Sequence, residues 1–163
     1  MSHVIFQATN VDGGVQLCCN VVGYQFPEIA HDDWCQVCVD VRQGEDSFHK
    51  IDPALDATDL RSIRDWFSAL ARNNLPRFAL LSFVEPCLSF EFLGCNDAGV
   101  RFAIHLGAEL KPNFQLKQLS YESKKWGIVF HLEPWRLAAV VTMLEEASGI
   151  FPPRRTMPPS GDP

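Results

Sequence analysis

The feature that most constrains the fold is a run of nine residues, 34–42, in which apolar and more polar side chains alternate. The odd-numbered positions are all apolar: Cys35, Val37, Val39 and Val41. The even-numbered positions are Trp34, Gln36, Cys38, Asp40 and Arg42. A period of two predicts a β-strand with one face against a core and the other face more polar. Such a strand needs partner strands on at least one side.

The rest of the chain supplies these partners and two helices. Strands are predicted at 4–8, 15–22, 48–51, 77–84, 88–93, 100–110 and 126–132. A helical period appears after Asp56 or Thr58, its two candidate N-caps, and fades at Asn73. A second helix opens at Pro134 and stops at Gly149. We therefore expect a mainly antiparallel α+β fold of seven or eight strands. The strands form one strongly curved sheet or two packed sheets, and two α-helices cover open ends or edges.

The chain of 163 residues is predicted to form a single globular domain, 1–155, followed by a flexible proline-rich tail, 156–163. Hydrophobic residues make up 47% of the chain, which is typical of a folded protein. No apolar stretch approaches the roughly 18 residues that span a bilayer. The first residues, 1–7, lack the basic start and apolar core of a secretory signal. We expect a cytoplasmic protein with no membrane partner.

The charge is concentrated in one segment. The chain has 20 acidic and 14 basic residues, and residues 28–65 hold ten of the acids against four bases, which equals the whole net charge of −6. This balance argues against binding nucleic acid, which requires a basic face. The segment is either a solvated surface with acids at a helix start, or a docking surface that attracts a basic partner.

The six cysteines do not form a recognisable metal or redox motif. The closest spacing is Cys35-x-x-Cys38, inside the alternating strand. Side chains three positions apart on a strand face opposite sides, so these two sulfurs should diverge. No second CxxC accompanies the first. We predict no metal site and no cofactor, with the thiols reduced and mostly buried.

No catalytic site is predicted either. Phosphate-binding, dinucleotide-binding, zinc-protease and serine-hydrolase motifs are all absent. An alternative function, a small-ligand carrier or an enzyme, would use the interior of a curved sheet. Its pocket would draw on Glu85, Glu91, His105 and His131. A third possibility is a structural or oligomerisation module, although the sequence does not define an oligomeric state.

Several short motifs occur together and in order. Residues 23–27 read Gly-Tyr-Gln-Phe-Pro, and Asp32-Asp33-Trp34 opens the alternating strand. Ser47-Phe48, Asp52-Pro53-Ala54-Leu55 and Asp65-Trp66-Phe67 follow in turn. Next come Phe83-x-Glu85-Pro86-Cys87-Leu88-Ser89-Phe90 and, near the end, Phe151-Pro152-Pro153-Arg154. Over residues 15–154 this series resembles the WapI-type bacterial immunity proteins, with Cys87 in place of an expected Asn.

The resemblance implies a non-enzymatic protein whose partner is a cognate toxin domain, often a nuclease. The acidic segment points the same way, because an acidic protein can compete with nucleic acid for a basic active site. We predict that the partner-binding residues are Asp32, Asp33, Trp34, Glu45 and Asp46. The acids would steer the partner, and Trp34 would serve as an anchor.

Overall fold

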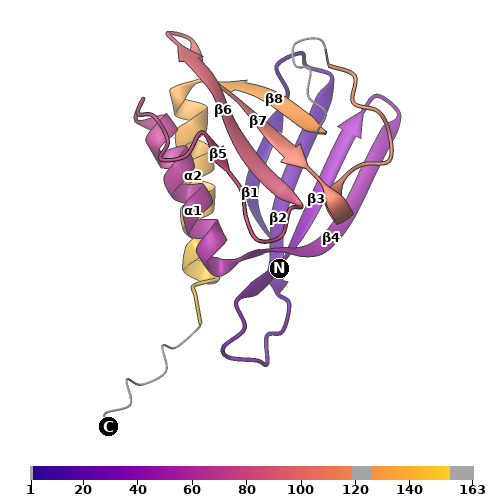
Figure 1. Ribbon diagram of the computed structural model, residues 1–163, viewed down its shortest axis with the longest axis vertical. Coiled ribbons are helices and arrows are strands. Elements are labelled where there is room, and N and C mark those ends of the chain that lie inside the picture. The colour runs from indigo at the N-terminus through magenta and orange to yellow at the C-terminus, as the bar shows by residue number, and fades with distance from the viewer. Residues whose placement is uncertain (1, 119–125, 155–163) are drawn as a thin grey trace.

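The computed structural model describes residues 2–118 and 126–154, so the predicted tail 156–163 lies outside the described residues. Eight strands form two antiparallel sheets, each ordered as in the chain (Figure 1). Sheet A contains β1 (His3–Thr9), β2 (Val15–Tyr24), β3 (Trp34–Gln43) and β4 (Asp46–Asp56). Sheet B contains β5 (Leu80–Leu81), β6 (Leu88–Asn96), β7 (Gly99–Leu106) and β8 (Gly127–Leu132). The helices are α1 (Ala57–Ala71) and α2 (Pro134–Ile150). The predicted α+β fold is confirmed, in its form with two packed sheets.

The two sheets face each other across an aromatic core. Phe6 of sheet A lies 4.9 Å from Phe130 and 6.1 Å from Phe102 of sheet B, measured between ring centroids. Phe67 of α1 joins them, 6.0 Å from Phe6 and 5.3 Å from Phe102. These rings meet edge-to-face or tilted, which is a favourable geometry for aromatic pairs. One hydrophobic cluster therefore unites both sheets and the helices.

The helices lie side by side along one flank of the sheets (Figure 1). Helix α1 begins at Asp56, whose side chain accepts a hydrogen bond from the Asp59 amide at 2.8 Å. The Asp59 carboxylate accepts one from the Asp56 amide at 3.0 Å, which completes a capping box. Of the two predicted caps, the structure uses Asp56 rather than Thr58. Helix α2 begins at Pro134, as predicted.

Two predicted strands are wrong in extent. Only Leu80 and Leu81 of the segment 77–84 pair in a sheet, and most of the flanking residues are exposed. The predicted strand 100–110 ends at Leu106, and the chain turns through Gly107 into a short 3-10 helix, η1 (Ala108–Leu110). Ala108 adopts a positive φ of 47° at this turn. The alternation of apolar residues continues through the turn, so the sequence pattern conceals it.

The predicted tight turn at 96–99 is confirmed. The Asn96 side chain accepts hydrogen bonds from the amides of Ala98 and Gly99. Gly99 has a φ of +158°, and a Cβ there would lie 2.4 Å from the Leu132 carbonyl oxygen. A glycine is therefore required where β7 begins beside β8. Within the described residues, no helix is long and apolar enough to cross a membrane.

Candidate functional site

The structure places the predicted partner-binding residues at opposite ends of strand β3. Asp32 and Asp33 end the loop before β3, Glu45 lies in the turn that follows β3, and Asp46 is the first residue of β4. Ten residues of strand separate the two pairs, which is about 30 Å at 3.3 Å per residue. The acids that are close in sequence thus form two separate groups rather than one cluster.

The first pair is part of an internal network, here called the Arg154 clasp: Asp33, Arg154 and Tyr24. Asp33 is only 2% exposed, and its carboxylate accepts a hydrogen bond of 2.6 Å from the Arg154 amide. The Arg154 guanidinium carbon lies 3.7 Å above the centre of the Tyr24 ring. The guanidinium also donates to backbone carbonyl oxygens of Phe26, Pro27 and Asp32. The buried carboxylate of Asp33 therefore links the loop before β3 to the segment that follows α2.

Asp32 and Trp34 are half-buried beside the clasp. The Asp32 side chain accepts a hydrogen bond of 3.0 Å from the Trp34 amide, which fixes the entry into β3. Trp34 falls on the same face of β3 as Cys38 and Asp40, opposite the core-facing odd positions. Both side chains retain enough exposed surface to contact a partner.

The second pair is open to solvent. Glu45 and Asp46 are exposed at the β3–β4 turn, where Gly44 adopts a positive φ of 58°. Among the described residues, no side chain forms an ion pair or hydrogen bond with either acid. Their charges are consequently directed into solvent, in contrast to that of Asp33.

The face of sheet A that points away from sheet B connects the two ends. We call it the outer face of sheet A. It carries a polar, open hollow of about 620 Å³. The hollow is lined in part by Gln7, Gln16, Cys18, Asp40, Arg42 and Arg136. Such a mixture of amide, thiol and charged side chains offers hydrogen bonds and charge contacts rather than an apolar cavity.

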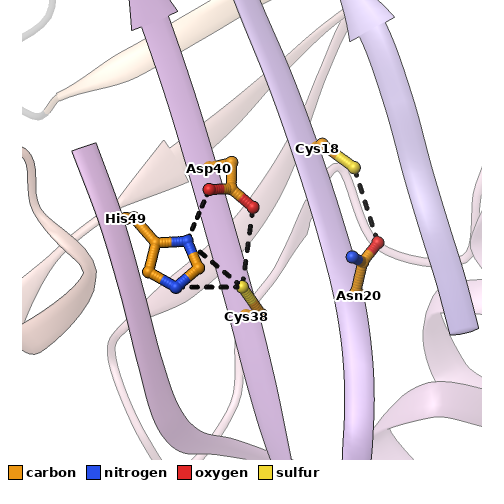
Figure 2. A network of polar contacts seen from close by, with 5 residues as sticks. All are labelled: Cys18, Asn20, Cys38, Asp40 and His49. Atoms are coloured by element: carbon orange, nitrogen blue, oxygen red, sulfur yellow. Dashed lines mark hydrogen bonds and ion pairs between the residues drawn. The ribbon is translucent and has the colours of Figure 1, made fainter. Parts of the chain in front are cut away.

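Three potential metal ligands meet beside this hollow: Cys38, Asp40 and His49, here called the Cys-Asp-His cluster (Figure 2). The Cys38 sulfur lies 3.5 Å from Asp40 Oδ2 and 3.7 Å from His49 Nδ1. His49 Nδ1 lies 2.6 Å from Asp40 Oδ1. Burial and the neighbouring Asp40 carboxylate raise the pKa of Cys38 to about 11. At neutral pH the thiol is therefore protonated and a poor nucleophile.

The spacing of the cysteines along the chain does not reveal this cluster. The register of the β3–β4 hairpin contains the signal. The turn at Gly44 and Glu45 sets Asp40 directly opposite His49, and Cys38 opposite Ile51. Pairing the predicted strands across that turn would have placed all three ligands on one face.

The predicted divergence of Cys35 and Cys38 is confirmed. Cys35 is fully buried in the core, and burial raises its pKa to about 12. The core cluster omits Cys38, whose sulfur contacts polar groups on the outer face of sheet A. All six cysteines are free thiols, of which Cys95 is exposed, Cys18 half-buried and the other four buried.

The residues named for a ligand site inside the sheet do not converge there. His105 and Glu91 pair at 2.8 Å, but His105 points to the opposite side of β7 from the core residue Ile104. His131 lies opposite Arg101, four positions along the strand from His105. A cleft of about 500 Å³ borders His105, whereas aromatic rings fill the space between the sheets. The core packing thus removes the physical basis for an interior pocket.

An exposed apolar surface after helix α1 was also missed. Leu75, Phe78 and Val84 are 76%, 53% and 89% exposed. The indole nitrogen of Trp66 donates to the Phe78 carbonyl oxygen at 2.9 Å, which fixes this segment to α1. A hollow of about 410 Å³ lies between Trp66 and Phe78. The sequence pattern predicts a strand over 77–84 and indicates no exposed apolar surface there.

The comparisons with known proteins give one match. No curated protein and no solved structure matches the chain. The model of the immunity protein WapI-like family matches residues 8–152. That range covers the last two residues of β1, strands β2 to β8 and both helices, and it includes Tyr24 and Asp33 of the clasp but not Arg154. The match thus confirms the resemblance seen in the short motifs, and the chain belongs to the immunity protein WapI-like family.

Proposed function

We propose that this protein is a cytoplasmic, non-enzymatic immunity protein that binds and neutralises the toxic domain of a cognate toxin. The family match over residues 8–152 is the observation that carries this proposal. The protonated state of Cys38 supports a binding role, because the thiol beside His49 and Asp40 is not activated as a nucleophile.

The partner docks through acidic residues, with Glu45 and Asp46 as the main contacts. These exposed carboxylates have no partner among the described side chains, so pairing them with a basic surface breaks no internal contact. Acids of this kind raise the association rate with a positively charged partner. A nuclease domain, whose active site must attract phosphates, is the class of toxin that this charge fits best.

The interface extends from the β3–β4 turn across the outer face of sheet A to Asp32 and Trp34. A standard interface buries about 800 Å² on each partner, which corresponds to a patch roughly 30 Å across. Strand β3 spans about the same distance. One partner domain can therefore contact both ends, with Asp33 supporting the loop from below rather than touching the partner.

Growth rescue tests the proposal. The toxic C-terminal domain encoded directly upstream is expressed with and without this protein, and we expect growth only when both are present. Glu45→Lys combined with Asp46→Lys should abolish rescue. The matched control is Glu145→Lys with Glu146→Lys, which reverses two exposed acids on α2. The control should rescue like the native protein.

A salt series sharpens the test. Affinity measured by titration calorimetry should fall as ionic strength rises, because exposed charge pairs are screened beyond about 10 Å at 0.1 M salt. A harmless upstream domain would overturn the immunity role. Rescue that survives the reversal of Glu45 and Asp46, but is lost with Phe78→Asp, would place the interface on the exposed apolar surface after α1 instead.

A further inference from the structure

We propose that Cys38, Asp40 and His49 bind a single Zn²⁺ ion on the outer face of sheet A, with water in the fourth coordination position. This site goes beyond the proposed function, and it can be tested on the purified protein alone. Figure 2 shows the three side chains turned toward one another from the neighbouring strands β3 and β4.

The chemistry of the three donors selects the metal. A thiolate, an imidazole nitrogen and a carboxylate oxygen form a ligand set typical of Zn²⁺. Mg²⁺ and Ca²⁺ prefer sites made of oxygen ligands alone, so the sulfur and nitrogen of Cys38 and His49 disfavour them. Three protein ligands plus water is the arrangement found in open zinc sites.

The distances from the sulfur to the other two donor groups fit a tetrahedron. Bonds of about 2.3 Å to sulfur and 2.0 Å to oxygen or nitrogen give edges of about 3.5 Å between sulfur and the other donors. The structure has Cys38 Sγ 3.5 Å from Asp40 Oδ2 and 3.7 Å from His49 Nδ1. His49 Nδ1 lies 2.6 Å from the other oxygen of the carboxylate, Asp40 Oδ1, because the two groups share a hydrogen bond. Metal binding through Nδ1 therefore breaks this hydrogen bond and leaves the imidazole in the tautomer that carries its proton on Nε2.

The site is both accessible and held in place. The side chains of His49 and Asp40 are 63% and 40% exposed, so an ion can enter from solvent. Cys38 is only 6% exposed, and the ladder between β3 and β4 fixes its position relative to His49. Binding exchanges the thiol proton of Cys38 for the metal, which places a formal charge of −2 from the thiolate and Asp40 against the +2 of zinc.

A neighbouring thiol provides the matched comparison. Cys18 lies opposite Asp40 on strand β2, but its sulfur contacts Asn20 Oδ1 at 3.4 Å, away from the cluster (Figure 2). It therefore stands outside the three-residue site. Cys95 in β6 is an exposed thiol on the other sheet and serves as a second control.

Zinc affinity of the reduced protein is measured by competition with a chromogenic chelator, and Co²⁺ provides a spectroscopic probe of thiolate ligation. We expect one ion per chain and a thiolate-to-cobalt charge-transfer band. Cys38→Ser should remove the band and weaken zinc binding by at least about 100-fold. Loss of a group that only orients a ligand costs up to about 100-fold, so loss of a ligand itself should cost at least as much. His49→Gln, at a side chain that is 63% exposed, should weaken binding to a similar extent.

The controls Cys18→Ser and Cys95→Ser should keep zinc affinity within about twofold and retain the cobalt band. Circular dichroism confirms that each variant is folded. The proposal is overturned if the native protein binds no zinc, if His49→Gln leaves the affinity unchanged, or if Cys18→Ser removes the band as completely as Cys38→Ser. Because no toxin is present, failure here leaves the immunity role intact, and failure of growth rescue leaves the zinc site intact.

Discussion

Acidic side chains at the two ends of strand β3 lie in contrasting surroundings. Asp33 is 2% exposed and accepts a hydrogen bond from the Arg154 amide, whereas Glu45 and Asp46 extend into solvent. The difference shows that a run of acids in a sequence does not by itself define a binding surface. Some carboxylates satisfy buried donors, and only the remaining ones are available to a partner.

Asp33→Ala should produce the largest loss of stability. It leaves the Arg154 amide without its acceptor and removes a carboxylate that is 2% exposed. We expect the free energy of unfolding, measured by urea denaturation, to fall by about 3 kcal/mol. Asp33→Asn keeps an acceptor and should lose less. An Asp33→Ala variant as stable as the native protein would show that the clasp is dispensable.

Arg154→Lys should cost about 2 kcal/mol. A single ammonium group cannot reach the three carbonyl oxygens that the guanidinium contacts, and it stacks less well on Tyr24. The same urea titration measures the loss, with Arg61→Lys at an exposed position of α1 as the control. Equal stability of the two variants would mean that charge alone, rather than the planar donor geometry, holds the loop.

Asp56→Ala should cost about 1 kcal/mol, the typical value for loss of an N-cap. This acid also belongs to the acid-rich segment, yet it acts inside the fold by capping α1 together with Asp59. Thermal unfolding followed by circular dichroism measures the effect. Asp56→Asn, which preserves a capping acceptor, should stay close to the native protein, and an equal loss in both variants would point to a charge effect instead.

Glu45→Lys with Asp46→Lys should change the free energy of unfolding by no more than about 0.5 kcal/mol, since both side chains are exposed. The same double variant is expected to abolish toxin rescue. A variant that keeps its stability but loses toxin rescue would show that these two acids bind the partner and do not support the fold. A strong loss of stability would place this turn with Asp33 among the structural acids.

The fold class could be predicted from the sequence because the local patterns of apolar and capping residues agree with the tertiary structure. The alternation over 34–42 matches the buried positions of β3, and Asp56 caps α1 as one of the two predicted candidates. The two wrong strand limits have different causes: residues 77–84 are apolar without regular alternation, and after Leu106 a regular alternation continues through a turn. Exposed Leu75, Phe78 and Val84 resemble core residues in composition, and only the structure shows that they face solvent.

The candidate sites were predictable only where they depend on local sequence. Exposure of Glu45 and Asp46 follows from the turn beside Gly44. Burial of Asp33 could not be foreseen, because its donor lies 121 positions away in the chain. The Cys-Asp-His cluster is intermediate between a local turn and a contact between distant segments. Its members are at most 11 residues apart, but they meet only in the correct hairpin register.

The long separation within the Arg154 clasp has a consequence for synthesis on the ribosome. Strands β1–β4 pair with their neighbours in the chain, so sheet A can begin to form as soon as it emerges. The loop before β3 must wait for Arg154, 121 residues later, which takes roughly 6 to 24 s at typical elongation rates of 5–20 residues per second. During that interval the hydrogen bond between Asp33 and the Arg154 amide cannot form. The end of sheet A that contains the loop before β3 can therefore reach its final structure only after the segment that follows α2 has been translated.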